Sequence, residues 1–333
     1  MLRSILTSIA LLSLCGLSPP AQAVQRVFVS AISGNDANTV TGCAASAPCR
    51  WFAGAITVVD PNGEIVAMDS GAYGAVTISK SVSIIGAPGV YAGITVFSGN
   101  GVTIATPGVK VALRGLTINN LGSGSNGIQM TAGDKLTVQN CMVTNFVSGS
   151  GLYVNTAAQV RLLDSVLQGN SYGAFLYDGP TALVSGSRFF DNVFSGLYAY
   201  AGGAGVTTRV EVSRSEASGN SHFGFYGVAN PSGEVELNLK DVVASRNGYG
   251  AGANSWNGAA LTTVSASLVS GNRFHGLRSY GSGAKLVAIA NTVSHNGTGL
   301  VQESSGVLQT TGDNVLTDNT IATTGAITAL TKM

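Results

Sequence analysis

A pattern of apolar and polar positions repeats along most of the chain. Each repeat is an apolar run that ends in Asn and is followed by Gly and a further apolar residue, as in the segment Val160–Leu176. The closing Asn recurs with gaps of 22 to 28 residues. A self-similar period in the range of about 20 to 50 residues is typical of proteins that stack one structural unit on the next. The closing residues are Asn120, Asn145, Asn170, Asn192, Asn220, Asn247, Asn272, Asn296 and Asn319.

The spacing within a repeat predicts strands. Apolar residues lie ten, eight and three positions before the Asn in most repeats, for example Val160, Leu162 and Leu167. The step of two between the first pair is the alternation of a strand with one buried side. An amphipathic helix would place apolar residues at steps of three and four, and the β-branched, Gly-rich composition does not favour helices. After the Asn comes Gly and a third short strand, as in Gly151–Val154 and Gly196–Ala199.

Three short strands in about 25 residues describe one turn of a parallel β-helix. We expect the Asn to occupy the bend between two strands, because Asn tolerates the left-handed backbone conformation. Stacked Asn side chains can also hydrogen-bond along the solenoid axis. A second column of small polar residues lies five positions before the Asn and is interrupted once, by Val242. Its members are Asn140, Ser165, Ser187, Ser215, Ser267, Asn291 and Asn314.

The segment Gly63–Gly89 reads GEIVAMDSGAYGAVTISKSVSIIGAPG and joins predicted strands through Gly-rich turns and a Lys-Ser pair. With this segment the chain resembles the right-handed parallel β-helix proteins of the pectin-lyase-like superfamily. The resemblance covers nearly all of the chain after the first residues. It implies an all-β fold, a right-handed parallel solenoid of about ten or eleven coils with a small N-terminal cap. It is poorly specific for chemistry, because one fold hosts many functions.

The sequence predicts that the chain is divided into three parts. Residues 1–23 are similar to a secretory signal, with Arg3, the apolar run Ile5–Leu17 and the small-residue site Ala21–Ala23. The apolar run is shorter than the roughly 20 residues that span a bilayer. Residues 24–61 are expected to form the cap, with a short amphipathic helix over Trp51–Asp60, and residues 62–333 the β-helix. We therefore expect export to the periplasm or the extracellular space, and no membrane span.

The cysteines fit an exported protein. Cys43 and Cys49 enclose a short segment of the predicted cap, and an oxidising compartment favours a disulfide between them. A metal site would need His or Cys partners close by in the sequence. Cys141 lies beside the stacked columns and is expected to be a packed thiol. Leu14, directly before Cys15, is too bulky for the usual lipid-attachment site. We expect no metal and no cofactor.

Charge narrows the range of partners. Only 10% of the residues are charged, against roughly 25% in an average domain, and the formal net charge is +1. No basic block or stripe stands out, so nucleic acid is not an expected partner. Near-neutrality also argues against strong capture of polyanions, although local patches stay open. We expect a monomer.

The third strand of each predicted coil carries outward aromatic residues, since the residue after the Gly points in and the next points out. Stacked at about 4.8 Å per coil, these rings would form a stripe that suits the apolar faces of sugar rings. Alternatively, cross-strand aromatic pairs stabilise the sheet, or the longer loops at 201–208, 230–233 and 252–258 fold over them. The outward residues are Tyr153, Phe175, Tyr177, Tyr198, Tyr200, Tyr226, Arg278 and Tyr280, with Trp256 in a nearby loop.

His222, His275 and Arg278 lie near this stripe, on the edge that leads into the third strands. In a lyase, Arg would neutralise a uronic carboxylate while His or Tyr acts as base and acid. His and Arg are also common turn residues of a polar solenoid. The chain lacks the superfamily's polygalacturonase motifs (Asn-Thr-Asp, Asp-Asp, Gly-His-Gly and Arg-Ile-Lys) and the Arg-x-Pro-x-x-Arg motif of pectate lyases. No catalytic residue is therefore transferred from the superfamily.

Two functions stay open. The first is binding of a polysaccharide or cell-surface glycan along the aromatic stripe, with β-elimination as the reaction if the protein is an enzyme. It requires Tyr198, Tyr226 and Tyr280 to be exposed in a groove. It also requires His222 or His275 to lie within hydrogen-bonding reach of a Tyr or an Arg. The second function is a non-catalytic surface, adhesion or structural rod.

Overall fold

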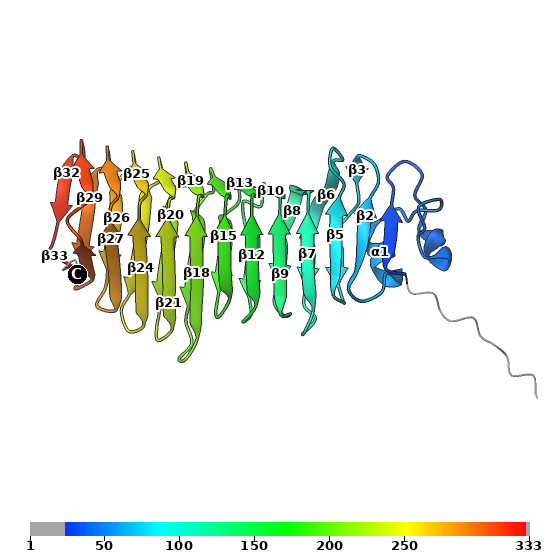
Figure 1. Ribbon diagram of the computed structural model, residues 1–333, viewed down its shortest axis with the longest axis horizontal. Coiled ribbons are helices and arrows are strands. Elements are labelled where there is room, and N and C mark those ends of the chain that lie inside the picture. Colours follow the sequence, from blue (N-terminus) through cyan, green and yellow to red (C-terminus); the bar gives the residue numbers. More distant parts are fainter. Residues whose placement is uncertain (1–23, 331–333) are drawn as a thin grey trace, which may run out of the picture.

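The computed structural model describes residues 24–330, which form an elongated solenoid of parallel strands (Figure 1). Each full coil contributes one strand to each of three sheets. The predicted all-β, right-handed parallel β-helix of about ten or eleven coils is confirmed, and the solenoid has about ten turns. The predicted secretory signal, residues 1–23, lies outside the described residues.

Three sheets run the length of the solenoid. The first, here named the long sheet, has 13 strands in chain order: β1 (Arg26–Val29), β2 (Gly63–Ala67), β5 (Val82–Gly86), β7 (Lys110–Arg114), β9 (Lys135–Gln139), β12 (Gln159–Leu163), β15 (Thr181–Ser185), β18 (Thr207–Ser213), β21 (Glu234–Lys240), β24 (Ala259–Ser265), β27 (Ala284–Ile289), β30 (Val307–Thr310) and β33 (Ile327–Ala329).

The second sheet contains the short strands β3 (Gly71–Ala72), β10 (Met142–Thr144), β13 (Val166–Gln168), β16 (Arg188–Phe190), β19 (Glu216–Ser218), β22 (Val243–Ser245), β25 (Leu268–Ser270), β28 (Thr292–Ser294) and β31 (Val315–Thr317). The third contains β4 (Val76–Ile78), β11 (Ser150–Asn155), β14 (Tyr172–Tyr177), β17 (Ser195–Ala201), β20 (Phe223–Ala229), β23 (Tyr249–Ser255), β26 (His275–Tyr280), β29 (Thr298–Glu303) and β32 (Ile321–Thr324). Two long strands, β6 (Ala92–Ile104) and β8 (Leu116–Met130), pass through both of these sheets.

The interior of the solenoid is filled by stacked apolar side chains. On the long sheet Val160, Ala182 and Val210 follow one another in register, and each is almost fully buried. The rings of Phe189 and Phe225 meet inside the coil with their centroids 6.2 Å apart. Strand alternation therefore places one set of residues in the core and leaves the other set facing outward.

An Asn ladder closes the bend between the second and third sheets from Asn170 to Asn319. In each step the backbone N–H and the side-chain Nδ2 donate to Oδ1 of the Asn in the next coil. For Asn192 and Asn220 these distances are 3.1 and 2.8 Å. Nδ2 of Asn220 also donates to the carbonyl of Phe189 at 3.0 Å. The buried amide thus satisfies backbone groups that the bend leaves without a strand partner.

The predicted left-handed conformation of the ladder Asn is wrong. The residue before it makes the bend, whereas none of the ladder residues from Asn170 to Asn319 has a positive φ. The residue before the Asn makes the left-handed turn, so the Asn itself is left with its side chain buried in the stack. The preceding residues with positive φ are Gly169, Asp191, Gly219, Arg246, Gly271, His295 and Asp318.

In the coil at residues 140–146, each Asn lies one residue before the position that it was predicted to occupy. Asn140 and Asn145 occupy the left-handed positions themselves, with φ of 51° and 70°. Phe146 then takes the ladder position, and its N–H donates to Oδ1 of Asn170 at 3.1 Å. Cys141 likewise takes the position predicted for Asn140. The regular spacing of the Asn residues therefore misplaces this one coil.

The second polar column is present, with Val242 as its interruption. The N–H of Cys141 donates to Oγ of Ser165 at 3.2 Å, and the N–H of Ser165 donates to Oγ of Ser187 at 3.3 Å. Cys141 is a buried free thiol, as expected, and burial raises its pKa to about 11. Both columns hold neighbouring coils in one register.

The N-terminal cap contains the predicted helix and disulfide, together with strand β1. The helix α1 (Phe52–Val58) buries Phe52, Ala55 and Ile56, and a short 3₁₀ helix, η1 (Asp36–Thr41), precedes it. Cys43 and Cys49 form a disulfide. Within residues 24–330, no helix is long and apolar enough to cross a membrane.

Asn220→Ala tests the ladder. The change removes the acceptor of the buried Asn192 N–H, so we expect the free energy of unfolding to fall by about 2–4 kcal/mol. Denaturant unfolding followed by circular dichroism measures it. Asn238→Ala, at an exposed position of the long sheet, is the matched control and should change stability by no more than about 0.5 kcal/mol. An equal loss in both variants would contradict the role of the ladder.

Candidate functional site

Outward aromatic side chains cover the third sheet over several successive coils. Register places Tyr153, Phe175, Tyr198 and Tyr226 next to one another in one row, and Tyr177 beside Tyr200 in a second row. The predicted stripe therefore exists as aligned rows. We name this surface the aromatic face. Its members are Tyr153, Tyr172, Phe175, Tyr177, Tyr198, Tyr200, Phe223, Tyr226, Tyr249 and Tyr280.

The rings of the aromatic face touch from coil to coil. Tyr177 and Tyr200 are stacked with centroids 5.0 Å apart and planes 9° apart. Tyr200 is also parallel to Tyr198, at 6.3 Å and 11°. Phe175 meets Tyr198 edge to face at 5.0 Å. Such pairs contribute about 0.5–1.5 kcal/mol each beyond their burial, so the face also stabilises the stack.

Most rings of the face are partly exposed, but Phe223 and Tyr226 are buried. The exposed fraction of Tyr226 is 7%, which overturns the expectation of an exposed Tyr226. The cause is Gly252, its partner in the next coil. A Cβ on Gly252 would lie 2.5 Å from Cε1 of Phe223, so the Phe223 ring occupies the space of the missing side chain. That ring stacks on Tyr226 with the centroids 3.8 Å apart.

The loop residue Trp256 joins the far end of the face. It is 46% exposed and meets Tyr280 edge to face with centroids 5.3 Å apart. Tyr280 itself is partly buried. At this end the face therefore presents a large, accessible indole next to a phenol ring.

His222 and His275 lie on either side of Tyr249. Each imidazole is 5.3 Å from the Tyr249 ring, and His222 also contacts Phe194 at 4.5 Å. The structure thus brings together two histidines from different coils, as expected. Nδ1 of each is buried without a hydrogen-bond partner among the described residues. The expected hydrogen bond to a Tyr or an Arg is not made by either Nδ1.

Arg278 is engaged by a residue that the sequence interpretation missed. Its Nε and Nη2 donate to Oε2 of Glu303 at 2.8 and 2.6 Å. The guanidinium also lies 4.3 Å from the centroid of the Tyr280 ring. The repeat spacing could have found this partner, because Glu303 follows Tyr280 by one period and is its register partner in the next coil.

The pKa shifts of the two histidines and of the buried tyrosines at the face favour their neutral forms. Burial lowers the pKa of His222, and the charge of Arg278 lowers it further. Burial also lowers the pKa of His275, where the charge of Glu303 opposes and that of Arg278 adds to the effect. Burial raises the pKa of Tyr198 and of Tyr226. At neutral pH the site therefore offers rings and neutral hydrogen-bonding groups.

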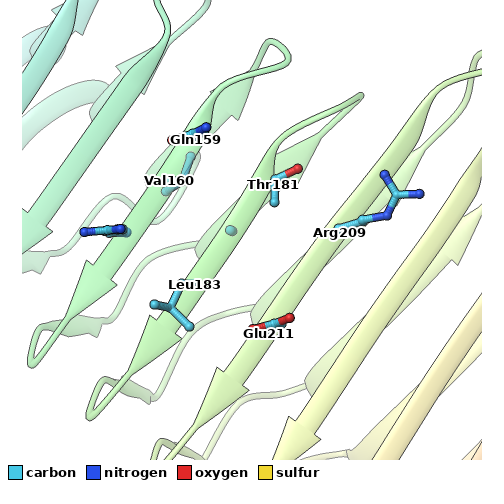
Figure 2. A pocket seen from close by; sticks show the side chains of 8 residues that line it. Gln159, Val160, Thr181, Leu183, Arg209 and Glu211 are labelled. Carbon is cyan, nitrogen blue, oxygen red and sulfur yellow. The ribbon is translucent and has the colours of Figure 1, made fainter.

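The outer surface of the long sheet carries two hollows. One, of about 240 Å³, lies over β12, β15 and β18 and is lined by the outward side chains of Arg161, Leu183, Arg209 and Glu211, among others (Figure 2). A second, of about 280 Å³, lies over β5, β7 and β9. Lys110, Arg114 and Lys135 line this second hollow. The sequence interpretation did not single out these cations.

Comparisons with known proteins agree with the fold. A family model described as the right handed beta helix region matches residues 57–209 and 92–267. Pectate lyase Pel9A is 17% identical, with a TM-score of 0.57 over 85% of this chain and 76% of its own. The A-module of the mannuronan C-5 epimerase AlgE6 from Azotobacter vinelandii is 14% identical, with a TM-score of 0.50 over 80% of this chain and 89% of its own. A search of curated proteins gives no match.

His222 predicts how stability depends on pH. Its folded-state pKa is below the ordinary value of 6.5, so the unfolded chain binds more protons as the pH falls below that value. Stability is fully present above the unfolded pKa and is lost as the pH drops through the folded pKa. We expect the free energy of unfolding to decrease as the pH falls below the ordinary imidazole pKa of 6.5, as measured by urea unfolding.

The variant His222→Phe keeps the ring contacts and removes the titration, so part of this decrease should disappear. His295→Asn, at an exposed turn with positive φ, is the control and should keep it. An unchanged pH profile in His222→Phe would show that this imidazole does not titrate as described.

Proposed function

We propose that this chain, which belongs to the right-handed β-helix family, binds a polysaccharide or cell-surface glycan along the aromatic face. The observation that carries the proposal is the continuous contact of partly exposed Tyr and Phe rings over successive coils. Binding sites for small and chain-like ligands are lined mainly by aromatic and apolar side chains with a few polar groups. Tyr supplies both, a flat ring and a hydroxyl.

The dimensions of the face favour a chain over a single sugar. From β11 to β26 six strands lie side by side, which spans about 24 Å at the usual strand spacing. Aromatic rings are available along this span, and Trp256 extends it at one end. The names of the two similar structures, a pectate lyase and a mannuronan epimerase, are in keeping with a polysaccharide partner.

Export from the cytoplasm would bring the chain to the same partner, a polysaccharide or cell-surface glycan. The disulfide between Cys43 and Cys49 is of a kind that persists in oxidising compartments. We propose that the chain is exported and meets its glycan in the periplasm or outside the cell, as a monomer.

Binding has more support than cleavage. The proposed catalytic group consists of His222, His275 and Arg278. Arg278 is already paired with Glu303, which leaves less of its charge for a uronic carboxylate. The pKa of Tyr198 is raised by burial, which disfavours this phenol as a base. In the alternative of a non-catalytic structural rod, the rings would serve only to stabilise the stack of coils.

Gel retardation tests the proposal. Wild-type protein and the variant Tyr177→Ala/Tyr200→Ala are run in native gels that contain neutral or uronic-acid polysaccharides. We expect retardation of the wild type and at least about tenfold weaker retardation of the variant, because two central rings are lost. Tyr91→Ala is the control, since Tyr91 is 50% exposed and lies outside the aromatic face.

Ultraviolet absorbance of the same samples detects unsaturated products. A product lost in His222→Ala or His275→Ala would make the protein a lyase. Absence of both retardation and product for every polysaccharide would contradict the binding proposal and favour the rod.

A second candidate function, binding of a polyanion on the long sheet, is favoured by a separate observation. Lys110 on β7 and Lys135 on β9 are register partners in adjacent coils. Arg114 lies on β7 as well, and Arg161 lies on β12, which pairs with β9. Among residues 24–330 none of these four cations forms an ion pair. Adjacent unpaired cations repel each other, and a carboxylate or sulfate held between them would relieve the repulsion.

The variant Lys110→Gln/Lys135→Gln tests this second candidate. We expect it to lose retardation by polygalacturonate, with the largest difference at low salt because exposed charges are screened. The control Lys240→Gln/Lys285→Gln removes the same charge from exposed positions elsewhere on the long sheet. Equal loss in both variants would show a response to net charge alone and would contradict a site at Lys110 and Lys135.

A further inference from the structure

We propose that the aromatic face selects an uncharged glycan and discriminates against polyuronates. This inference rests on the proposed function and names the class of ligand at the same surface. It follows from the charges that the face presents, from the position of one carboxylate at its border, and from the contrast with the long sheet.

The aromatic face is almost free of charge. The six strands β11, β14, β17, β20, β23 and β26 contain one charged residue in total, Arg278. Both nitrogen atoms that Arg278 directs at Glu303 are within 2.8 Å of one carboxylate oxygen. A ligand carboxylate on this face would therefore meet no unpaired cation in the six strands.

A negative charge lies at one border of the face, next to Tyr177. Asp178 follows Tyr177 directly, and its Oδ1 accepts a hydrogen bond from the N–H of Gly202 at 2.7 Å. Its carboxylate is close enough to Tyr153 and Tyr200 to raise the pKa of both phenols, although burial is the larger cause. A uronate chain placed over these rings would thus be repelled at this edge.

Desolvation decides between the two ligand classes. A carboxylate moved from water onto an apolar surface loses hydration that only a cation or several hydrogen-bond donors can replace. The hydroxyl groups of a neutral sugar need only ordinary partners, which the partly exposed Tyr phenols and the amide of Asn155 can supply. The C–H faces of the sugar ring pack on the aromatic rings at no such cost.

The two outer surfaces of the solenoid therefore differ in the ligand that they suit. The long sheet presents the unpaired cations Lys110, Lys135, Arg114 and Arg161, whereas the aromatic face presents rings and one neutralised guanidinium. Any polyuronate bound by this protein is expected on the long sheet. The glycan on the aromatic face is expected to be a neutral oligosaccharide or polysaccharide.

Native gels that contain either hydroxyethyl cellulose and galactomannan or polygalacturonate and alginate test the inference. The proteins are the wild type, Tyr177→Ala/Tyr200→Ala, Tyr91→Ala and Lys110→Gln/Lys135→Gln. We expect a neutral polysaccharide to retard the wild type, Tyr91→Ala and the Lys variant, and to retard the Tyr variant at least about tenfold less. Circular dichroism spectra and unfolding midpoints show that each variant is folded.

One outcome would overturn the inference alone: retardation by a polyuronate that the Tyr variant loses and the Lys variant keeps. The aromatic face would then bind an acidic chain, and the proposed function would stand. If the Tyr variant is retarded as strongly as the wild type by every neutral and every acidic polysaccharide, both the inference and the proposed function would be overturned.

Glu303→Gln supplies a test by gain of function. It removes the anion that neutralises Arg278 and should strengthen retardation by polygalacturonate at least about threefold. This gain should disappear when Arg278→Gln is added. A Glu303→Gln variant with unchanged polygalacturonate retardation would contradict the assigned role of the ion pair.

Discussion

The in-register stacking of coils is the constraint on which the rest of the structure depends. Parallel strands satisfy one another's backbone groups only while the chain stays in register, and the sharp bend between two strands breaks that pattern. The buried Asn ladder from Asn170 to Asn319 restores it, because each amide serves backbone and side-chain groups of neighbouring coils. A shift of one residue in any coil would reverse its inward and outward side chains.

Register also creates the two surfaces for which ligands are proposed. Residues that are about 25 apart in the sequence become direct neighbours, so a modest preference for Tyr at one position of the repeat becomes a row of touching rings. The same rule places Lys110 beside Lys135. One solenoid thus offers an uncharged aromatic surface and a basic surface on different sheets, and the proposed ligands differ accordingly.

The sequence predicts the repeat well because strand alternation and stacking columns are local rules. The three strands per coil, the helix of the cap and the outward aromatic rows follow from spacing, and the disulfide was expected from an oxidising compartment. The exceptions arise from contacts between coils. Tyr226 is buried because Gly252 in the next coil leaves space for Phe223, and Arg278 is neutralised by Glu303 across one period. The sequence interpretation missed the cations Lys110, Arg114, Lys135 and Arg161 because they are dispersed along the chain and form no basic block.

Fluorescence of Trp256 during titration with a neutral glycan tests the central claim most directly. The chain has two Trp residues, so Trp51→Phe leaves Trp256, at the end of the aromatic face, as the sole reporter. A saturable shift in its emission that disappears in a Tyr177→Ala/Tyr200→Ala background is the predicted result. An emission spectrum that does not respond to any glycan that retards the protein would place binding elsewhere and contradict the account.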